Sequence, residues 1–169
     1  MLIKSVRGFT PKYGIDCFFA ENSTIIGEVI MGDNCSVWYQ AIIRGDVNSI
    51  EIGNCVNIQD GAVVHGTYEQ SGTKIGNHVS VGHNAIIHGC TINDSVLVGM
   101  GSIIMDDSVI ESNSIIAAGS VLPKNTIVPK GSVFAGVPAK KIKEIDLGLK
   151  EGEIERIANN YLTYASWFK

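Results

Sequence analysis

The sequence predicts an all-β fold built from a short repeat and followed by one C-terminal α-helix. Three observations predict it: aliphatic residues recur every six positions, glycine accounts for 19 of 169 residues, and the end of the chain changes to helical spacing. No amphipathic helix has a period of six. Short Val- and Ile-rich runs between glycines favour short strands joined by turns.

The repeat begins each six-residue unit with an aliphatic residue and often places a small or β-branched residue fifth. The first residues of the units are Ile25, Met31, Val37 and Ile43, then Ile52, Ile58 and Val64, then Ile75, Val81 and Ile87, then Ile92, Val98, Ile104, Ile110, Ile116, Leu122 and Val128. A β-sandwich with coincidental spacing is the alternative, and so many units in succession argue against it.

This pattern resembles the hexapeptide-repeat family over roughly residues 10–139. Members of that family fold as a left-handed parallel β-helix in which three units complete a turn and the aliphatic position points into the core. The resemblance therefore implies this fold, but a fold alone says little about activity.

The period changes after Phe134–Lys140, whose sequence FAGVPAK resembles the family's usual exit from the β-helix. We expect a helix over about residues 151–168, lying along the β-helix within a single domain of residues 1–169. The helical spacing is carried by Ile154, Ile157, Ala158, Tyr161, Leu162, Ala165 and Phe168. The apolar face of this helix must be buried on its own coils or on a neighbour.

Charge and hydropathy exclude several classes of function. The net charge of -4 gives no reason to expect nucleic acid or an anionic membrane as partner. No apolar run approaches the ~18 residues that span a bilayer, and the start MLIKSVRGFTPKYG lacks the apolar segment of a secretory signal. The four cysteines, without a CxxC pair, are expected to be buried thiols in a reducing cytoplasm, with a disulfide or a cysteine-bound metal as alternatives.

The histidines are the strongest functional signal, because all four occur within one short segment: His65, His78, His83 and His88. Counting units places His65 and His88 in one column of a three-sided coil, together with Arg44. Adjacent coils lie ~4.8 Å apart, so these two imidazoles could share one cation at ~2.0–2.1 Å each.

His83 belongs to another side of the coil, ~16 Å of extended chain away from His88. It could join the same cation only from a second subunit, and three-fold symmetry would then create three shared sites. Gln59 and Asp60 fall on the side that carries His83. His78 falls on a third side without a partner, and we expect it to be solvated.

At these residues the sequence resembles the γ-class carbonic anhydrases. The matching segments are Arg44-Gly45-Asp46, Asn57–Asp60, Val64-His65 and Val81–Cys90. The resemblance implies a homotrimer in which His65, His83 and His88 bind Zn²⁺, with Fe²⁺ or Co²⁺ as alternatives, and His83 comes from the neighbouring subunit. It also implies reversible hydration of CO₂ to bicarbonate, since a metal with three neutral imidazoles lowers the pKa of bound water from 15.7 to about 7.

Further roles follow from the same resemblance. Arg44 and Asp60 would form a salt bridge across the subunit interface, with Asp46 in the same polar network and Asn57 in support. Gln59 would help to orient the metal-bound water.

Two features of the sequence differ from the most active members of the family. Val47 follows Asp46 where those members carry a glutamate, and the loop over residues 66–74 is short. Glu69 in this loop is the candidate proton shuttle, with a solvated loop glutamate as the alternative. Tyr161 matches a tyrosine near the metal, with a core aromatic residue of the helix as the alternative.

Two other classes of function remain open at this point. An acyl-CoA-dependent acyltransferase or thioesterase on the same fold would use one histidine as general base and would not need three. A structural homologue of low activity is the second alternative, although a buried cluster of unpaired histidines would be costly to keep.

Overall fold

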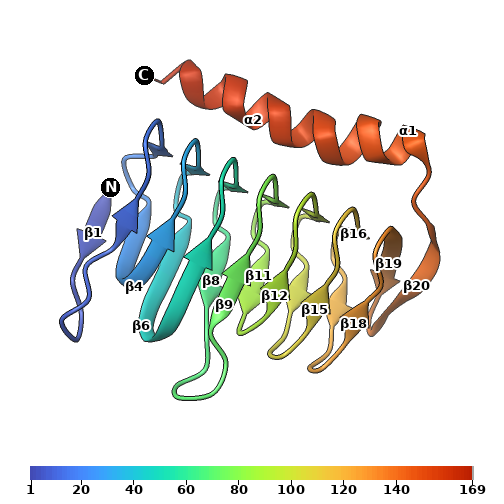
Figure 1. The fold of residues 1–169 in the computed structure, drawn as a ribbon, viewed down its shortest axis with the longest axis horizontal. Helices are drawn as coiled ribbons and strands as arrows, with labels where there is room; N and C mark the ends of the chain where they lie inside the picture. Colours follow the sequence, from blue (N-terminus) through green and yellow to red (C-terminus); the bar gives the residue numbers. More distant parts are fainter. Residues whose placement is uncertain (169) are drawn as a thin grey trace.

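The computed structural model describes residues 1–168 and confirms the predicted left-handed parallel β-helix with one C-terminal helix (Figure 1). The coil has three faces. A 12-stranded sheet covers two of them, because its strands β4 (Thr24–Met31) and β6 (Ile42–Ile52) continue around a corner, and an 8-stranded sheet covers the third.

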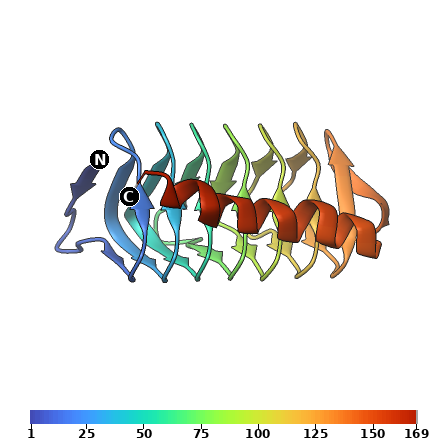
Figure 2. The same cartoon turned by 90° about the horizontal axis from the view of Figure 1, so that it is seen from above.

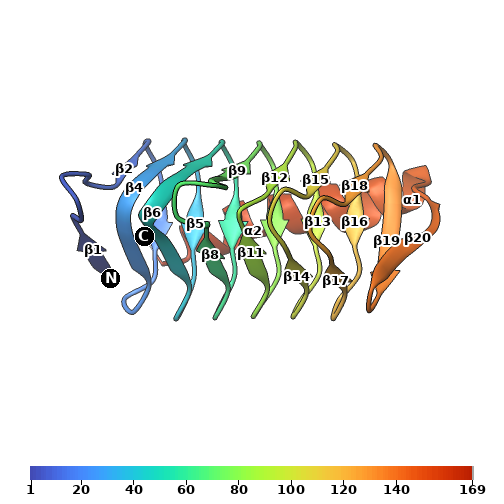
Figure 3. The same ribbon diagram turned by 90° about the horizontal axis from the view of Figure 1, so that it is seen from below.

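We name the faces by what they carry. The His65 face consists of the first half of β6 with β8 (Val63–His65), β11 (Ile86–His88), β14 (Ile103–Ile104) and β17 (Val121–Leu122). The open face continues from β6 through β9 (Thr73–Ile75), β12 (Thr91–Ile92), β15 (Val109–Ile110) and β18 (Ile127–Val128). The helix face contains β3 (Phe18–Phe19), β5 (Ser36–Val37), β7 (Asn57–Ile58), β10 (Ser80–Val81), β13 (Leu97–Val98), β16 (Ile115–Ile116) and β19 (Ser132–Gly136), which pairs with the antiparallel β20 (Ala139–Glu144). Figure 3 shows the coils stacked side by side.

The aliphatic residues at the start of each unit form the core. Val64, Ile87, Ile104 and Leu122 are in register on successive strands of the His65 face, and all four are fully buried. Since side chains alternate along a strand, the residues on either side of each of them point outward. The repeat therefore fixes which residues of every strand reach the surface.

The β-helix begins earlier than expected. The sequence pattern starts at about residue 10, but β1 (Leu2–Lys4) already pairs in parallel with β4, as does β2 (Lys12–Tyr13). Only Ile3 of β1 packs against the core. Because this incomplete coil contributes a single core residue, it gives no six-residue spacing from which the strand could be predicted.

The C-terminal helix lies along the whole helix face (Figure 2). It consists of α1 (Leu147–Leu149), the π-helical segment η1 (Lys150–Glu155) and α2 (Arg156–Ser166). It begins before residue 151 because the Asp146 side chain accepts a hydrogen bond from the Leu149 amide and caps an extra turn. Lys169, the last residue of the expected domain, lies outside the described residues. Within residues 1–168, no helix is both long and apolar enough to cross a membrane.

The cysteines are free thiols, so the disulfide alternative is wrong for them. Cys35 and Cys90 are buried as expected, whereas Cys17 and Cys55 are only partly buried. Burial raises the pKa of the Cys90 thiol to about 12, which keeps it protonated and unreactive.

Candidate metal centre

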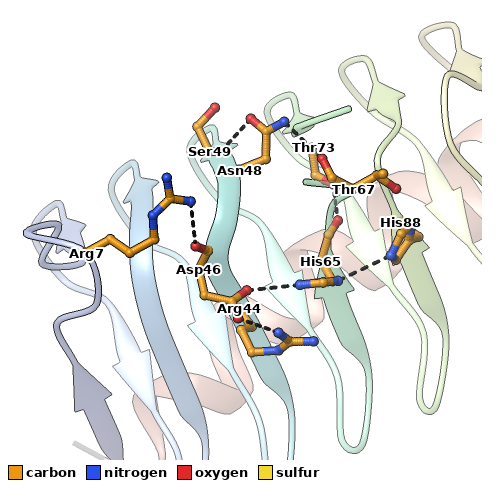
Figure 4. Close-up of polar contacts among 9 residues, drawn as sticks. All are labelled: Arg7, Arg44, Asp46, Asn48, Ser49, His65, Thr67, Thr73 and His88. Atoms are coloured by element: carbon orange, nitrogen blue, oxygen red, sulfur yellow. Dashed lines mark hydrogen bonds and ion pairs between the residues drawn. The ribbon is translucent and has the colours of Figure 1, made fainter. Parts of the chain in front are cut away.

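His65 and His88 lie side by side at the ends of β8 and β11 (Figure 4). The two strands pair in register at these residues, because Val64 and Ile87 occupy equivalent core positions one coil apart. The Nδ1 atom of His65 is 3.2 Å from the Nε2 atom of His88. One nitrogen of each ring therefore faces the other ring.

The remaining nitrogen of His65 contacts a carboxylate. Its Nε2 lies 3.0 Å from Oδ1 of Asp46, whose Oδ2 pairs with the Arg44 guanidinium at 2.5 Å. Burial opposes ionisation of Asp46, but the hydrogen bonds from Arg44 and His65 lower its pKa below the usual value. Asp46 is therefore ionised at neutral pH, and the His65 nitrogen must donate the proton of this hydrogen bond.

The remaining nitrogen of His88 has an equivalent partner, Asp106. His88 Nδ1 lies 3.0 Å from Oδ1 of Asp106, and the same oxygen accepts a hydrogen bond from Thr67 at 2.5 Å. The other oxygen, Oδ2, pairs with Lys124 at 3.3 Å. Burial opposes ionisation here too, yet these hydrogen bonds lower the pKa of Asp106 to about 2. Asp106 is not among the residues predicted from sequence, although the repeat count could have found it, since it follows the core residue Ile104 by two.

The two facing nitrogens show that this pair suits a cation. A neutral imidazole has one N–H, and in both rings that N–H is donated to a carboxylate. When both rings are neutral, His65 Nδ1 and His88 Nε2 face each other at 3.2 Å, each with a lone pair. Burial lowers the pKa of His65, which favours its neutral form. A divalent cation satisfies both lone pairs, and nitrogens bound tetrahedrally at ~2.0–2.1 Å stand roughly 3.3–3.4 Å apart.

His83 occupies a different part of the coil. It lies in the turn between β10 and β11, where the helix face meets the His65 face. Its Nδ1 is 2.9 Å from Oδ2 of Asp60, and its Nε2 is 3.4 Å from the Tyr161 hydroxyl. Across residues 1–168, no three His, Cys, Asp or Glu side chains converge on one metal position. A single chain therefore provides two facing imidazoles and a third one elsewhere, each with a carboxylate on one nitrogen.

Tyr161 contacts both the coil and His83. It packs edge-on against Trp38 with ring centroids 5.2 Å apart, as an aromatic residue at the helix–coil contact does. Burial and the nearby Asp60 raise its pKa to about 12. The hydroxyl therefore keeps its proton and can donate it to Nε2 of His83.

Gln59 and Asn57 form a buried polar chain on the helix face. Gln59 donates to Asn57 at 2.9 Å, and Asn57 donates to Ser80 at 2.8 Å. Gln59, His83 and Tyr161 line one cavity of about 430 Å³ between the helix and the helix face. The free carbonyl oxygen of Gln59 is thus fixed near His83.

Three other expectations have simple outcomes. Arg44 pairs with Asp46 in its own chain and Asp60 with His83, so the expected contact between Arg44 and Asp60 is not made within one chain. Glu69 is exposed in the loop after His65, which is typical of a solvated glutamate. His78 is exposed at a corner of the coil, as expected.

Comparisons with known proteins place the chain in a family. Residues 89–124 match the model described as "Bacterial transferase hexapeptide (six repeats)". A carbonic anhydrase of Geobacillus kaustophilus is 37% identical over 171 residues, covering 99% of this chain and 91% of that protein. The mitochondrial gamma carbonic anhydrase 2 of Arabidopsis thaliana is 42% identical over 164 residues, covering 92% of this chain and 58% of that protein. Among solved structures, a hexapeptide transferase family protein from Anaplasma phagocytophilum is 39% identical with a TM-score of 0.94, covering 99% of this chain and 98% of that one. The chain belongs to the γ-class carbonic anhydrase family of hexapeptide-repeat proteins.

Proposed function

We propose that this chain is a homotrimeric carbonic anhydrase that reversibly hydrates CO₂ to bicarbonate. In this proposal His65 and His88 of one subunit and His83 of the next bind one divalent metal ion. The observation that carries the proposal is the pair of facing ring nitrogens of His65 and His88, 3.2 Å apart. His83 supplies a third imidazole of the same kind, with one nitrogen held by a carboxylate.

The metal is Zn²⁺ in this proposal, with Fe²⁺ or Co²⁺ as alternatives that the same ligands accept. When bound, a divalent cation supplies a Lewis acid that makes hydroxide available near neutral pH. The protein's own groups provide orientation. Asp46, Asp60 and Asp106 each accept the N–H of one histidine and so fix which nitrogen is left as a ligand. For His83 this is Nε2, which would exchange its contact with the Tyr161 hydroxyl for the metal.

Gln59 and Tyr161 serve the reactants in this proposal. Because the Gln59 amide nitrogen is bound to Asn57, its oxygen is left to accept a hydrogen bond from water in the cavity. Leu97, Met100 and Ile157 line the same cavity and offer a nonpolar wall to CO₂. Each turnover also releases a proton, and Glu69 is an exposed carboxylate that could pass it to solvent.

A row of outward-facing aliphatic residues supports a trimer. We call this row the aliphatic ladder. It runs in register along the His65 face and consists of Ile42, Val63, Ile86, Ile103 and Val121. Ile42 and Ile86 keep 37% and 38% of their surface exposed in the single chain. Contiguous apolar surface of this kind marks an interface, and the ladder lies beside His65 and His88.

The compartment and partners follow from composition. The free thiols suit the reducing cytoplasm, where we place the protein. With a net charge of -4, CO₂ and bicarbonate are the expected partners beside the other subunits, rather than nucleic acid.

Acyl transfer is the second candidate, because the matched repeat model and the solved structure from Anaplasma phagocytophilum carry transferase descriptions. One sample, purified anaerobically without chelator, separates the candidates. We expect about one divalent metal per chain, and CO₂ hydration by stopped flow that chelation abolishes. Metal-free protein that releases thiol from an acyl-CoA would support acyl transfer instead. Bound metal without hydration would identify a structural homologue.

A further inference from the structure

Asp106 connects three parts of the chain that are distant in sequence. It follows β14 on the coil next to His88, it receives a hydrogen bond from Thr67 in the loop after His65, and it pairs with Lys124 on the following coil. The residue is only 6% exposed. A buried carboxylate with this many partners has a single orientation, because each of its oxygens is held from a different direction.

The contact with His88 has a defined proton position. An ionised carboxylate can only accept hydrogen bonds, so Nδ1 of His88 must be the donor at 3.0 Å. Lys124 lies 3.3 Å from Oδ2 of the same carboxylate, and Thr67 donates a hydrogen bond to its Oδ1, as suits an ionised acceptor. The proton on Nδ1 leaves the lone pair on Nε2, which is the nitrogen that faces His65.

The same arrangement occurs on both facing histidines. His65 is bound by Asp46, and Asp46 is paired with Arg44. His88 is bound by Asp106, and Asp106 is paired with Lys124 at 3.3 Å. Two independent histidine–carboxylate–cation chains thus aim their free nitrogens at the same point.

The loop over residues 66–72 depends on the same coil. Thr67 donates to Asp106 at 2.5 Å, and Ser71 donates to the adjacent, exposed Asp107 at 2.7 Å. Asp107 contacts the loop without contacting His88. The chain therefore contains a natural control for any effect that arises only from loop anchoring.

We propose that Asp106 is a positioning residue that fixes His88 as the Nδ1–H tautomer with Nε2 directed at the metal position. This role rests on the proposed function, because it assigns His88 as a metal ligand. Outer carboxylates of this kind increase the basicity of the ligand and hold its ring in place. Lys124 offsets the buried negative charge, so that the carboxylate stays available to His88.

The test compares Asp106→Ala and Asp106→Leu with Asp107→Asn. In metal-free protein at neutral pH, imidazole ¹⁵N NMR should report the Nδ1–H tautomer of His88 in the wild type and in Asp107→Asn. Asp106→Ala should shift His88 towards the Nε2–H tautomer. In chelator competition, Zn²⁺ should bind ~10–100-fold more weakly to Asp106→Ala, while Asp107→Asn retains the wild-type affinity. Asp106→Leu keeps a similar side-chain volume without an acceptor and gives the same comparison if the alanine variant does not fold.

The outcomes separate the two proposals. Unchanged His88 tautomer and Zn²⁺ affinity in folded Asp106 variants would overturn the positioning role while leaving the metal site intact. An equal loss of affinity in Asp107→Asn would overturn it in favour of loop anchoring. A wild-type protein that binds no Zn²⁺ would overturn the proposed function, and the tautomer measurement would still decide what Asp106 does to His88.

Discussion

Replacing His83 by alanine is expected to remove the metal, although His83 contacts neither His65 nor His88 in its own chain. Metal content should fall to background, and CO₂ hydration should fall by more than the ~10–100-fold typical of a lost outer-shell partner. The reason is that two imidazoles alone leave the cation without its third protein ligand. Elemental analysis and stopped-flow hydration measure the two effects.

His78→Ala is the matched control for this variant. His78 is exposed at another corner of the same short segment and has no place in the proposed site. It should keep the metal content and the hydration rate of the wild type. A His83→Ala protein that retains metal and full activity would contradict the assignment of His83 as a ligand.

Placing a charge in the aliphatic ladder is expected to abolish activity while every histidine remains. Ile86→Glu puts a carboxylate in the middle of the ladder on the His65 face. Burying an unpaired charge in an apolar interface is strongly unfavourable, so the subunits should separate. Light scattering after size exclusion should give the 18.1 kDa mass of one chain instead of about three times that value.

Ile127→Glu controls for a general effect of a surface charge. Ile127 is 64% exposed on the open face, away from the ladder, and its replacement should leave the trimer and the activity unchanged. An Ile86→Glu protein that stays trimeric and active would rule out the ladder as the subunit contact.

The repeat made most of the fold predictable from sequence. Every coil must bury one aliphatic residue per side. The six-residue spacing of residues such as Val64, Ile87 and Ile104 therefore predicts where each strand lies in the coil. The ends of the fold did not follow from this rule. β1 buries little beyond Ile3, and the extra helical turn depends on one capping residue, Asp146. Neither leaves a periodic signal.

The site was predictable only where it follows the repeat. The count places His65 beside His88, because both follow a core residue directly. The pairing of His88 with Asp106 also depends on side-chain direction and on the loop that brings Thr67 to the same carboxylate. The contact of Tyr161 with His83 depends on how the helix is placed along the coil, which helical spacing alone does not determine.

Mixing two inactive variants tests most directly the claim that subunits share the metal site. One variant carries His83→Ala, and the other carries both His65→Ala and His88→Ala. In co-expressed trimers, an intact site forms wherever the first variant provides His65 and His88 and its neighbour provides His83. Random assembly in equal amounts should restore about one quarter of the wild-type sites. Metal content and CO₂ hydration near that fraction are the expected result. Mixed trimers as inactive and metal-free as the two parent variants would contradict the shared site.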